Sequence, residues 1–414
     1  MSIKFLSSDI TEKEPISIEL AAQEDDKQKE YKALLQKCLN QILDAENIIV
    51  LAGSGTSLTF NLPNSEHIAP SMVDLWHACR GMNERIFDEI KSYTEYDNFA
   101  GKWKDDNGNE YIALDIELFL SRCDKFLILG NLSDRRLNQL NKFIKDAKNK
   151  ILEVTDFTEK ITNSQSWKDH EKLLRVLGKR QAKQKRLKVF TTNYDLAFET
   201  AASNIGMTVI DGFEYSMPYR FNPSWFNYDI VYRTQSNDKS ISYLPNVFHL
   251  YKIHGSVDWI RTEQGIQKRR NEKQQGEPVI IYPSSNKYQT SYESPYLDMV
   301  SSFLNAIQQP KTAILCLGFG FNDKHINNAI TMALRTNPEL LLMVGTRSLF
   351  DKKGSFNGEI RSLLTSAVKA GDSRISLVDS DFSDFVNQLP DRNKSTPEED
   401  IFKIFQELAM GNKS

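Results

Sequence analysis

The sequence has few cysteines, and none of them are paired along the chain. Cys38, Cys79, Cys123 and Cys316 lie far apart, and no Cys-x-x-Cys pair occurs. This spacing argues against a disulfide framework and against a zinc ribbon, and it favours a reducing cytoplasm. We therefore expect a cytoplasmic protein without a structural metal.

Long apolar runs and a strong charge bias are also missing. The apolar runs have the length of strands and fall short of the roughly 18 residues that a membrane-spanning helix needs. The formal net charge is -3 over 414 residues, so the overall charge favours neither nucleic acid nor a membrane surface as a partner. Acidic residues follow the first few positions in place of an apolar core, so no signal peptide is expected. A chain of this length predicts a core domain with additions.

Three short apolar stretches each run directly into polar residues. They span residues 48–51, 187–190 and 247–253, and the polar segments that follow are 52–57, 191–195 and 254–256. Each stretch is typical of a buried parallel strand whose carboxyl end delivers polar side chains. Ligands bind at that end in open α/β sheets, so three neighbouring strands of this kind would face one crevice.

Other apolar stretches complete an alternation of strands and helices. Strands are expected at residues 207–210, 313–317, 340–344 and 375–378, and helices at residues 29–45, 196–202 and 296–307. This alternation predicts an α/β fold with a doubly wound, mainly parallel Rossmann-like sheet. Residues 71–179 read as mostly helical, with one helical stripe across residues 111–129, and are interpreted as a helical insertion that forms a lid or an oligomer surface.

Both ends of the chain are placed outside the sheet domain, which is expected to span residues 28–390. Residues 1–27 lack a long apolar period and are interpreted as an arm or linker, although residues 16–20 alternate and could pair as a strand with a partner. Residues 391–414 predict a C-terminal helix, which Thr396 can cap.

The polar strand ends resemble the motifs of the sirtuin-like (silent-information-regulator-like) NAD-consuming proteins. That family carries a Gly-Ala-Gly-Ile-Ser-like loop, a Thr-Gln-Asn-Ile-Asp-like strand end and a His-Gly turn, in the order of residues 52–57, 191–195 and 254–256 here. A fourth segment, residues 317–327, is similar to the Gly-Tyr-Ser-Phe-x-Asp segment of bacterial sirtuin-like defence proteins. Four motifs in the right order make the resemblance specific, although much of the chain between them is unmatched.

The resemblance implies an NAD pocket at these strand ends, with NAD as the substrate and no metal. Asn193 is expected to bind a ribose hydroxyl or to orient the attacking water, and His254 is expected to act as the base. Asp195 is cast as an acceptor that positions the strand end. The residues expected to contact the nucleotide are Ala52, Gly53, Ser54, Gly55, Thr56, Thr192, Asp195, Gly255, Gly318, Gly320, Asn322 and Asp323.

The chain departs from the deacylase branch of this family in two places. Sirtuin deacylases continue the glycine loop with a Gly-Ile-Pro-Asp-Phe-Arg segment, whereas residues 61–65 read Asn-Leu-Pro-Asn-Ser. Zinc-dependent sirtuins place two cysteine pairs after the His-Gly turn, whereas residues 259–277 are a charged, Gln-rich stretch that reads as a hairpin or surface excursion. The preferred function is therefore an NAD+ glycohydrolase of bacterial anti-phage defence. An NAD-dependent protein deacylase and a non-enzymatic NAD or ADP-ribose sensor or scaffold stay open.

The resemblance also implies regulation by assembly, because an unregulated NADase would kill its host. We expect a homo-oligomer, and compact relatives point to a hexameric HerA-like ATPase as a further partner. The basic runs at residues 179–186 and 268–270 are interpreted as solvated segments, because no aromatic residues are interleaved in them, and contact with nucleic acid stays open.

Other titratable residues receive no role in this interpretation. Asp115 and Glu117 resemble an acidic spot of bacterial relatives, but solvation at the surface is the preferred interpretation for each. His249 is expected in the core or at a strand edge, and His170 is left unassigned.

Overall fold

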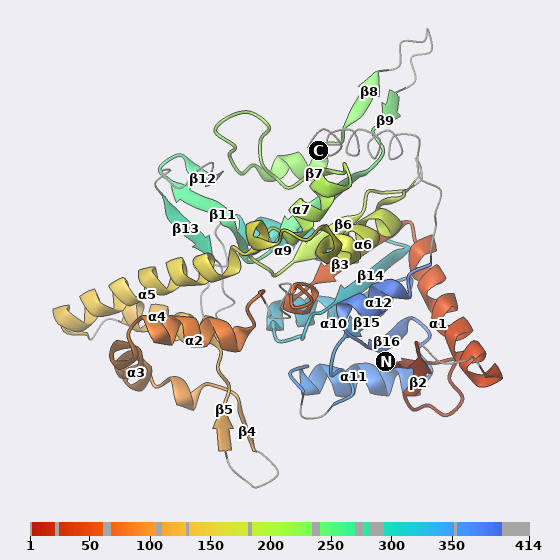
Figure 1. Ribbon diagram of the computed structural model, residues 1–414, viewed down its shortest axis with the longest axis horizontal. Helices are drawn as coiled ribbons and strands as arrows, with labels where there is room; N and C mark the ends of the chain where they lie inside the picture. The colour runs from red at the N-terminus through yellow and green to blue at the C-terminus, as the bar shows by residue number, and fades with distance from the viewer. Residues whose placement is uncertain are drawn as a thin grey trace.

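The computed structural model describes residues 2–20, 25–60, 68–104, 110–129, 132–180, 184–233, 241–269, 276–280, 294–351 and 354–390. Within these ranges a nine-stranded sheet with the order β2-β1-β16-β15-β14-β3-β6-β10-β7 forms the centre of the molecule (Figure 1). The parallel strands are β3 (Asn47–Ala52), β6 (Lys188–Thr191), β7 (Thr208–Ile210), β10 (Val247–Lys252), β14 (Thr312–Leu317), β15 (Leu341–Thr346) and β16 (Ile375–Asp379). The predicted mixed α/β architecture with a mainly parallel sheet is confirmed.

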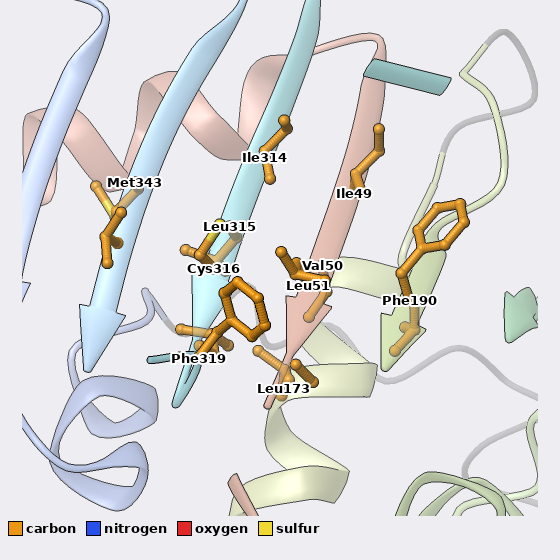
Figure 2. Packing of buried hydrophobic residues seen from close by; sticks show 14 of the residues in the cluster. Ile49, Val50, Leu51, Leu173, Phe190, Ile314, Leu315, Cys316, Phe319 and Met343 are labelled. Atoms are coloured by element: carbon orange, nitrogen blue, oxygen red, sulfur yellow. The ribbon is translucent and has the colours of Figure 1, made fainter. Parts of the chain in front are cut away.

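The central strands are buried along their whole length, as continuous apolar runs in a parallel sheet require. Every residue of β3 and of β14 is buried. Figure 2 shows side chains of these two strands, such as Val50 and Leu315, packed side by side, with Leu173 of α6 (Lys168–Gly178) close to the strand ends. The same core takes in α1 (Asp26–Asp44), whose apolar stripe includes Leu35 and Leu39.

The N-terminal residues form sheet strands where an arm was expected. β1 (Ser2–Ser7) pairs antiparallel with β16, and β2 (Ile16–Glu19) pairs antiparallel with β1. The physical reason is a period of two: Ile3 and Phe5 alternate with exposed residues, and all of their apolar surface is buried. The expectation of an arm is therefore wrong for residues 2–7, and the strand considered possible at residues 16–20 forms as β2 and pairs within the chain.

The helical insertion has a hydrophobic core of its own and lies beside the sheet (Figure 1). It consists of α2 (Met72–Met82), α3 (Glu84–Tyr93), the hairpin β4 (Lys102–Lys104) and β5 (Glu110–Ile112), α4 (Ile116–Leu129) and α5 (Asp134–Thr155). The helical stripe predicted across residues 111–129 thus begins later, because residues 110–112 form a strand. Within the range predicted for the insertion, α6 packs on the main core through residues such as Leu173 and Leu177.

The remaining helices connect or cover the strands. They are α7 (Ala197–Asn204), α9 (Tyr296–Ile307), α10 (Lys324–Thr336), α11 (Gly358–Lys369) and α12 (Phe382–Asn387). None of the helices in the described ranges combines the length and hydrophobicity needed to cross a lipid bilayer. The segment at residues 61–65 and the helix predicted at residues 391–414 lie outside the described residues.

Two small sheets complete the described fold. β8 (Val231–Arg233) pairs with β9 (Ile241–Tyr243), and β11 (Gly255–Thr262) lies between β12 (Gly265–Lys268) and β13 (Glu277–Ile280). The stretch after His254 is therefore part of a three-stranded sheet, which bears out the hairpin. It is also more buried than a surface excursion, because Trp259 is 1% exposed and its ring lies 5.1 Å from that of Phe213.

Candidate functional site

Four neighbouring strands end at the same level of the sheet. Leu317 of β14 pairs with Ala52 of β3, Ala52 pairs with Thr191 of β6, and Thr191 pairs with Lys252 of β10. The polar segments that follow these strands therefore start side by side. β3, β6 and β10 lie next to one another in the sheet, as predicted. β14 lies on the other side of β3, so the segment that follows it starts beside the glycine loop.

The glycine loop after β3 packs directly against the loop after β14. The amide of Gly55 donates to the carbonyl oxygen of Gly318 at 3.0 Å. A Cβ atom on Gly53 would lie 2.7 Å from that oxygen, and one on Gly55 would lie 2.6 Å from the Cα of Gly318. These glycines are therefore required by the contact between the two loops. Gly318 itself has φ +55°, which favours glycine.

Several backbone amides of the loop expected to contact the nucleotide form hydrogen bonds inside the protein. Gly53 donates to the carbonyl of Leu317, and Thr56 donates to the carbonyl of Gly53, each at 3.0 Å. Ala52 is a buried strand residue, whereas Ser54 is exposed at the surface of the loop. Of the predicted loop contacts, Ser54 is the residue whose side chain is best placed to meet a ligand.

Asn193 and Asp195 tie the end of β6 to the glycine loop. The Nδ2 of Asn193 donates to Gly53 O at 3.1 Å, Thr56 Oγ1 at 3.2 Å and Ser57 Oγ at 3.0 Å. The Ser57 hydroxyl in turn donates to Oδ2 of Asp195 at 2.8 Å, while Oδ1 of Asp195 accepts from the first amide of α7 at 3.0 Å. Asp195 thus links the glycine loop to the start of α7, as a positioning residue would. The side-chain oxygen of Asn193 is not used in the three hydrogen bonds that its Nδ2 makes.

His254 and Asp323 form a buried pair, with 3.2 Å between Nε2 and Oδ2. The other carboxylate oxygen of Asp323 caps α10 by accepting from the amides of His325 and Ile326 at 2.8 and 3.2 Å. Burial lowers the pKa of His254, but the hydrogen bond to Asp323 and the charges of Glu117 and Asp323 outweigh it, so the net pKa is raised. Asp323, expected as a nucleotide contact, is here the partner of the imidazole.

Glu117 of the insertion reaches the same place, which the sequence interpretation missed. Its Oε1 accepts a hydrogen bond of 2.7 Å from the hydroxyl of Tyr194, the residue between Asn193 and Asp195. Burial raises the pKa of Glu117 to about 6, and the charge of His254 opposes that rise. Surface solvation is therefore the wrong interpretation for Glu117. The nearby Asp115 is half-buried and accepts from the Leu118 amide at 2.9 Å.

Lys252 is a second residue that sequence reasoning overlooked. Its ammonium group is buried and donates to the carbonyl oxygens of Tyr194 and Asp195 and to Oε1 of Glu199. Burial raises the pKa of Glu199, and the charge of Lys252 opposes that shift. A lysine at the end of a buried, mostly apolar strand, two residues before His254, was the available signal.

The other predicted contacts are distributed around this centre. Gly255 has φ +90°, and a Cβ there would lie 2.1 Å from the carbonyl oxygen of Val279 in β13. The backbone conformation and the close approach of β13 therefore both require glycine at this position. Thr192 is half-buried and donates its amide to Ala52 O at 3.1 Å. Gly320 and Asn322 are tied to the segment at residues 355–357 by hydrogen bonds of 2.9 and 3.4 Å.

The described residues contain no group of three or more His, Cys, Asp or Glu side chains arranged to hold a metal ion. An open hollow of about 360 Å³ lies between residues 223–227, β10 and α9 and is lined by residues such as Lys188 and Asp298. None of the predicted catalytic or nucleotide-contacting residues lines it.

Residues 187–353 match the model of the SIR2-like domain family. The SIR2-like segment contains Asn193, His254 and Asp323, and it supports the sirtuin-like resemblance and an NAD-related function. No curated protein matches the chain. Among solved structures, cytosolic 5′-nucleotidase IIIB bound to cytidine is 10% identical with a TM-score of 0.31, over 86% of this chain and 88% of that one. At that TM-score the two folds are not similar enough to indicate a shared function.

Proposed function

We propose that this protein is an NAD+ glycohydrolase that converts NAD+ and water to ADP-ribose and nicotinamide. The observation that carries the proposal is that Asn193 and His254 follow the adjacent strands β6 and β10 within the SIR2-like segment, where His254 is paired with Asp323. Ligands bind at this edge of open α/β sheets. A buried histidine with a carboxylate partner is suited to take up a proton there.

In the proposed reaction the bond between ribose C1′ and the nicotinamide nitrogen breaks, and its electron pair leaves with nicotinamide. Water then adds to the oxocarbenium-like C1′, and neutral His254 accepts the proton that the water loses. The carboxylate of Asp323 stabilises the imidazolium that forms. The amide oxygen of Asn193, free of the bonds that fix its Nδ2, orients a ribose hydroxyl or the attacking water.

The proposal extends to a cytoplasmic role in bacterial anti-phage defence through NAD depletion. Exposed apolar side chains on the insertion, Phe99 at 54%, Ile128 at 64% and Leu129 at 77% exposure, support its use as a surface for homo-oligomerisation. A HerA-like hexameric ATPase as partner rests on the family resemblance alone.

The test is to incubate purified protein with NAD+, with and without a HerA-like ATPase, and to quantify nicotinamide and ADP-ribose. Equal amounts of both products, formed without any acylated peptide, support a glycohydrolase. Nicotinamide release that requires an acyl-lysine peptide would indicate a deacylase. Binding of NAD+ with no product under either condition would indicate a sensor or scaffold.

A further inference from the structure

Tyr194 connects the strand end to the insertion. It stands between Asn193 and Asp195, yet its side chain is buried in the hydrophobic core of the insertion together with Val257 and Ile280. Its hydroxyl group donates to Glu117 at 2.7 Å, across a sequence separation of 77 residues. The residue that follows Asn193 is thus held by the insertion, whereas Asn193 itself is held by the glycine loop.

Glu117 also brings a charge to His254. The ring of Tyr194 lies 6.5 Å from that of His254. The negative charge of Glu117 raises the pKa of His254. The titratable groups that face Glu117 are Asp115 on its own helix, Tyr194 after β6, His254 after β10 and Asp323 at the start of α10. Two carboxylates from different parts of the fold therefore act on one histidine.

We propose that Glu117 is a positioning residue of the site that holds Tyr194 beside His254, so that the site is complete only while the insertion is docked on the strand ends. This inference rests on the proposed function. It gives the insertion a role in the reaction: a partner or a second copy that shifts α4 would change the protonation of the base without touching the strands. The consequence is a pH dependence that the insertion controls.

The first test is the pH profile of NAD+ hydrolysis. Without the negative charge of Glu117 the imidazole loses its proton more easily, so the acid limb of the Glu117→Gln profile should move down by up to about one pH unit. Glu117→Asp keeps the charge and should stay closer to wild type. Glu84→Gln, an exposed change on α3 of the same insertion, is the matched control and should leave the profile in place. Equal displacement of the Gln and Asp profiles would overturn the proposal.

The second test does not require activity, so it separates this inference from the proposed function. The protein has six histidines, and the NMR signal of His254 can be assigned by its loss in His254→Asn. Glu117→Gln should lower the pH at which His254 titrates. Tyr194→Phe removes the hydrogen bond but leaves the carboxylate, and should shift it less than Glu117→Gln does. An unchanged His254 titration in folded Glu117→Gln would overturn the proposal, even in a protein that hydrolyses NAD+.

Discussion

Nε2 of His254 lies 3.2 Å from Oδ2 of Asp323, although the two residues follow strands that are separated in the sheet by β3 and β6. The segment after β14 therefore reaches across two strand ends to meet the one after β10. The pair therefore joins the segments that follow two non-adjacent strands at the polar edge of the sheet.

Asp323→Asn should destabilise the protein in a pH-dependent way. Asparagine can still cap α10, so the difference from wild type reports mainly the charge on His254. The raised pKa of His254 contributes stability that is fully present below its unfolded pKa of about 6.5 and is lost as pH rises through the folded pKa. The gap between the two unfolding free energies, measured by urea titration, should be widest near pH 5.5 and should narrow toward pH 8. A gap that widens with pH would contradict this account.

Gly53→Ala should destabilise the protein by about 1–3 kcal/mol, because its Cβ would overlap the Gly318 carbonyl oxygen and neither loop can move away freely. Gly81→Ala is the matched control. Gly81 lies in α2 and a Cβ there meets nothing within 4 Å, so the change should stabilise by about 0.5–1 kcal/mol. Thermal melts of both variants provide the comparison. Tolerance of alanine at Gly53 would show that the contact between the loops is unimportant.

Lys252→Met should cost about 3–5 kcal/mol, since it leaves the carboxylate of Glu199 and two carbonyl oxygens without their shared donor. Lys311→Met, which breaks an exposed pair with Glu46, should cost at most about 1 kcal/mol. The two side chains differ in exposure, at 2% and 59%, and this difference is what the comparison measures. A similar loss of unfolding free energy in both variants would show that the buried hydrogen bonds of Lys252 do not stabilise the fold.

His170→Phe should make the protein less sensitive to acid. His170 is fully buried among Phe60, Phe198 and Phe382, and burial lowers its pKa to about 3. Stability is therefore present above the unfolded pKa of about 6.5 and is lost, by up to about 1.4 kcal/mol per pH unit, as pH falls toward 3. Between pH 6.5 and 4.5 the unfolding free energy of the variant should fall less steeply. A change at the exposed His77 to Gln serves as control, and identical slopes in wild type and His170→Phe would count against this explanation.

The sheet and the strand-end residues were predictable because both depend on local pattern. Continuous apolar runs predicted β3, β6 and β14, and the expected helix at residues 296–307 coincides with α9. β1 was missed because it pairs with β16, more than 360 residues later, whereas the alternation at residues 16–20 did indicate the strand that forms as β2.

The contacts of the site could not be predicted from local pattern. Glu117 and Tyr194 are far apart in sequence, and only the docking of the insertion makes an acidic residue at the start of a helix part of a buried cluster. His254 and Asp323 are also far apart in sequence, and they meet only because the segments after β10 and β14 converge. The glycines of the loop after β3 also have a reason that the sequence did not show: Gly53 and Gly55 pack against Gly318, which is independent of any contact with the nucleotide.

The most direct test of the account is nicotinamide release by His254→Ala, with folding checked by circular dichroism. Loss of the base should reduce the rate by about 10²–10⁴-fold, and Asn193→Ala should also lose activity, with some loss of stability because Asn193 makes three hydrogen bonds to the glycine loop. His77→Ala, an exposed change, should keep the wild-type rate. A folded His254→Ala protein that releases nicotinamide at near the wild-type rate would contradict the proposed mechanism.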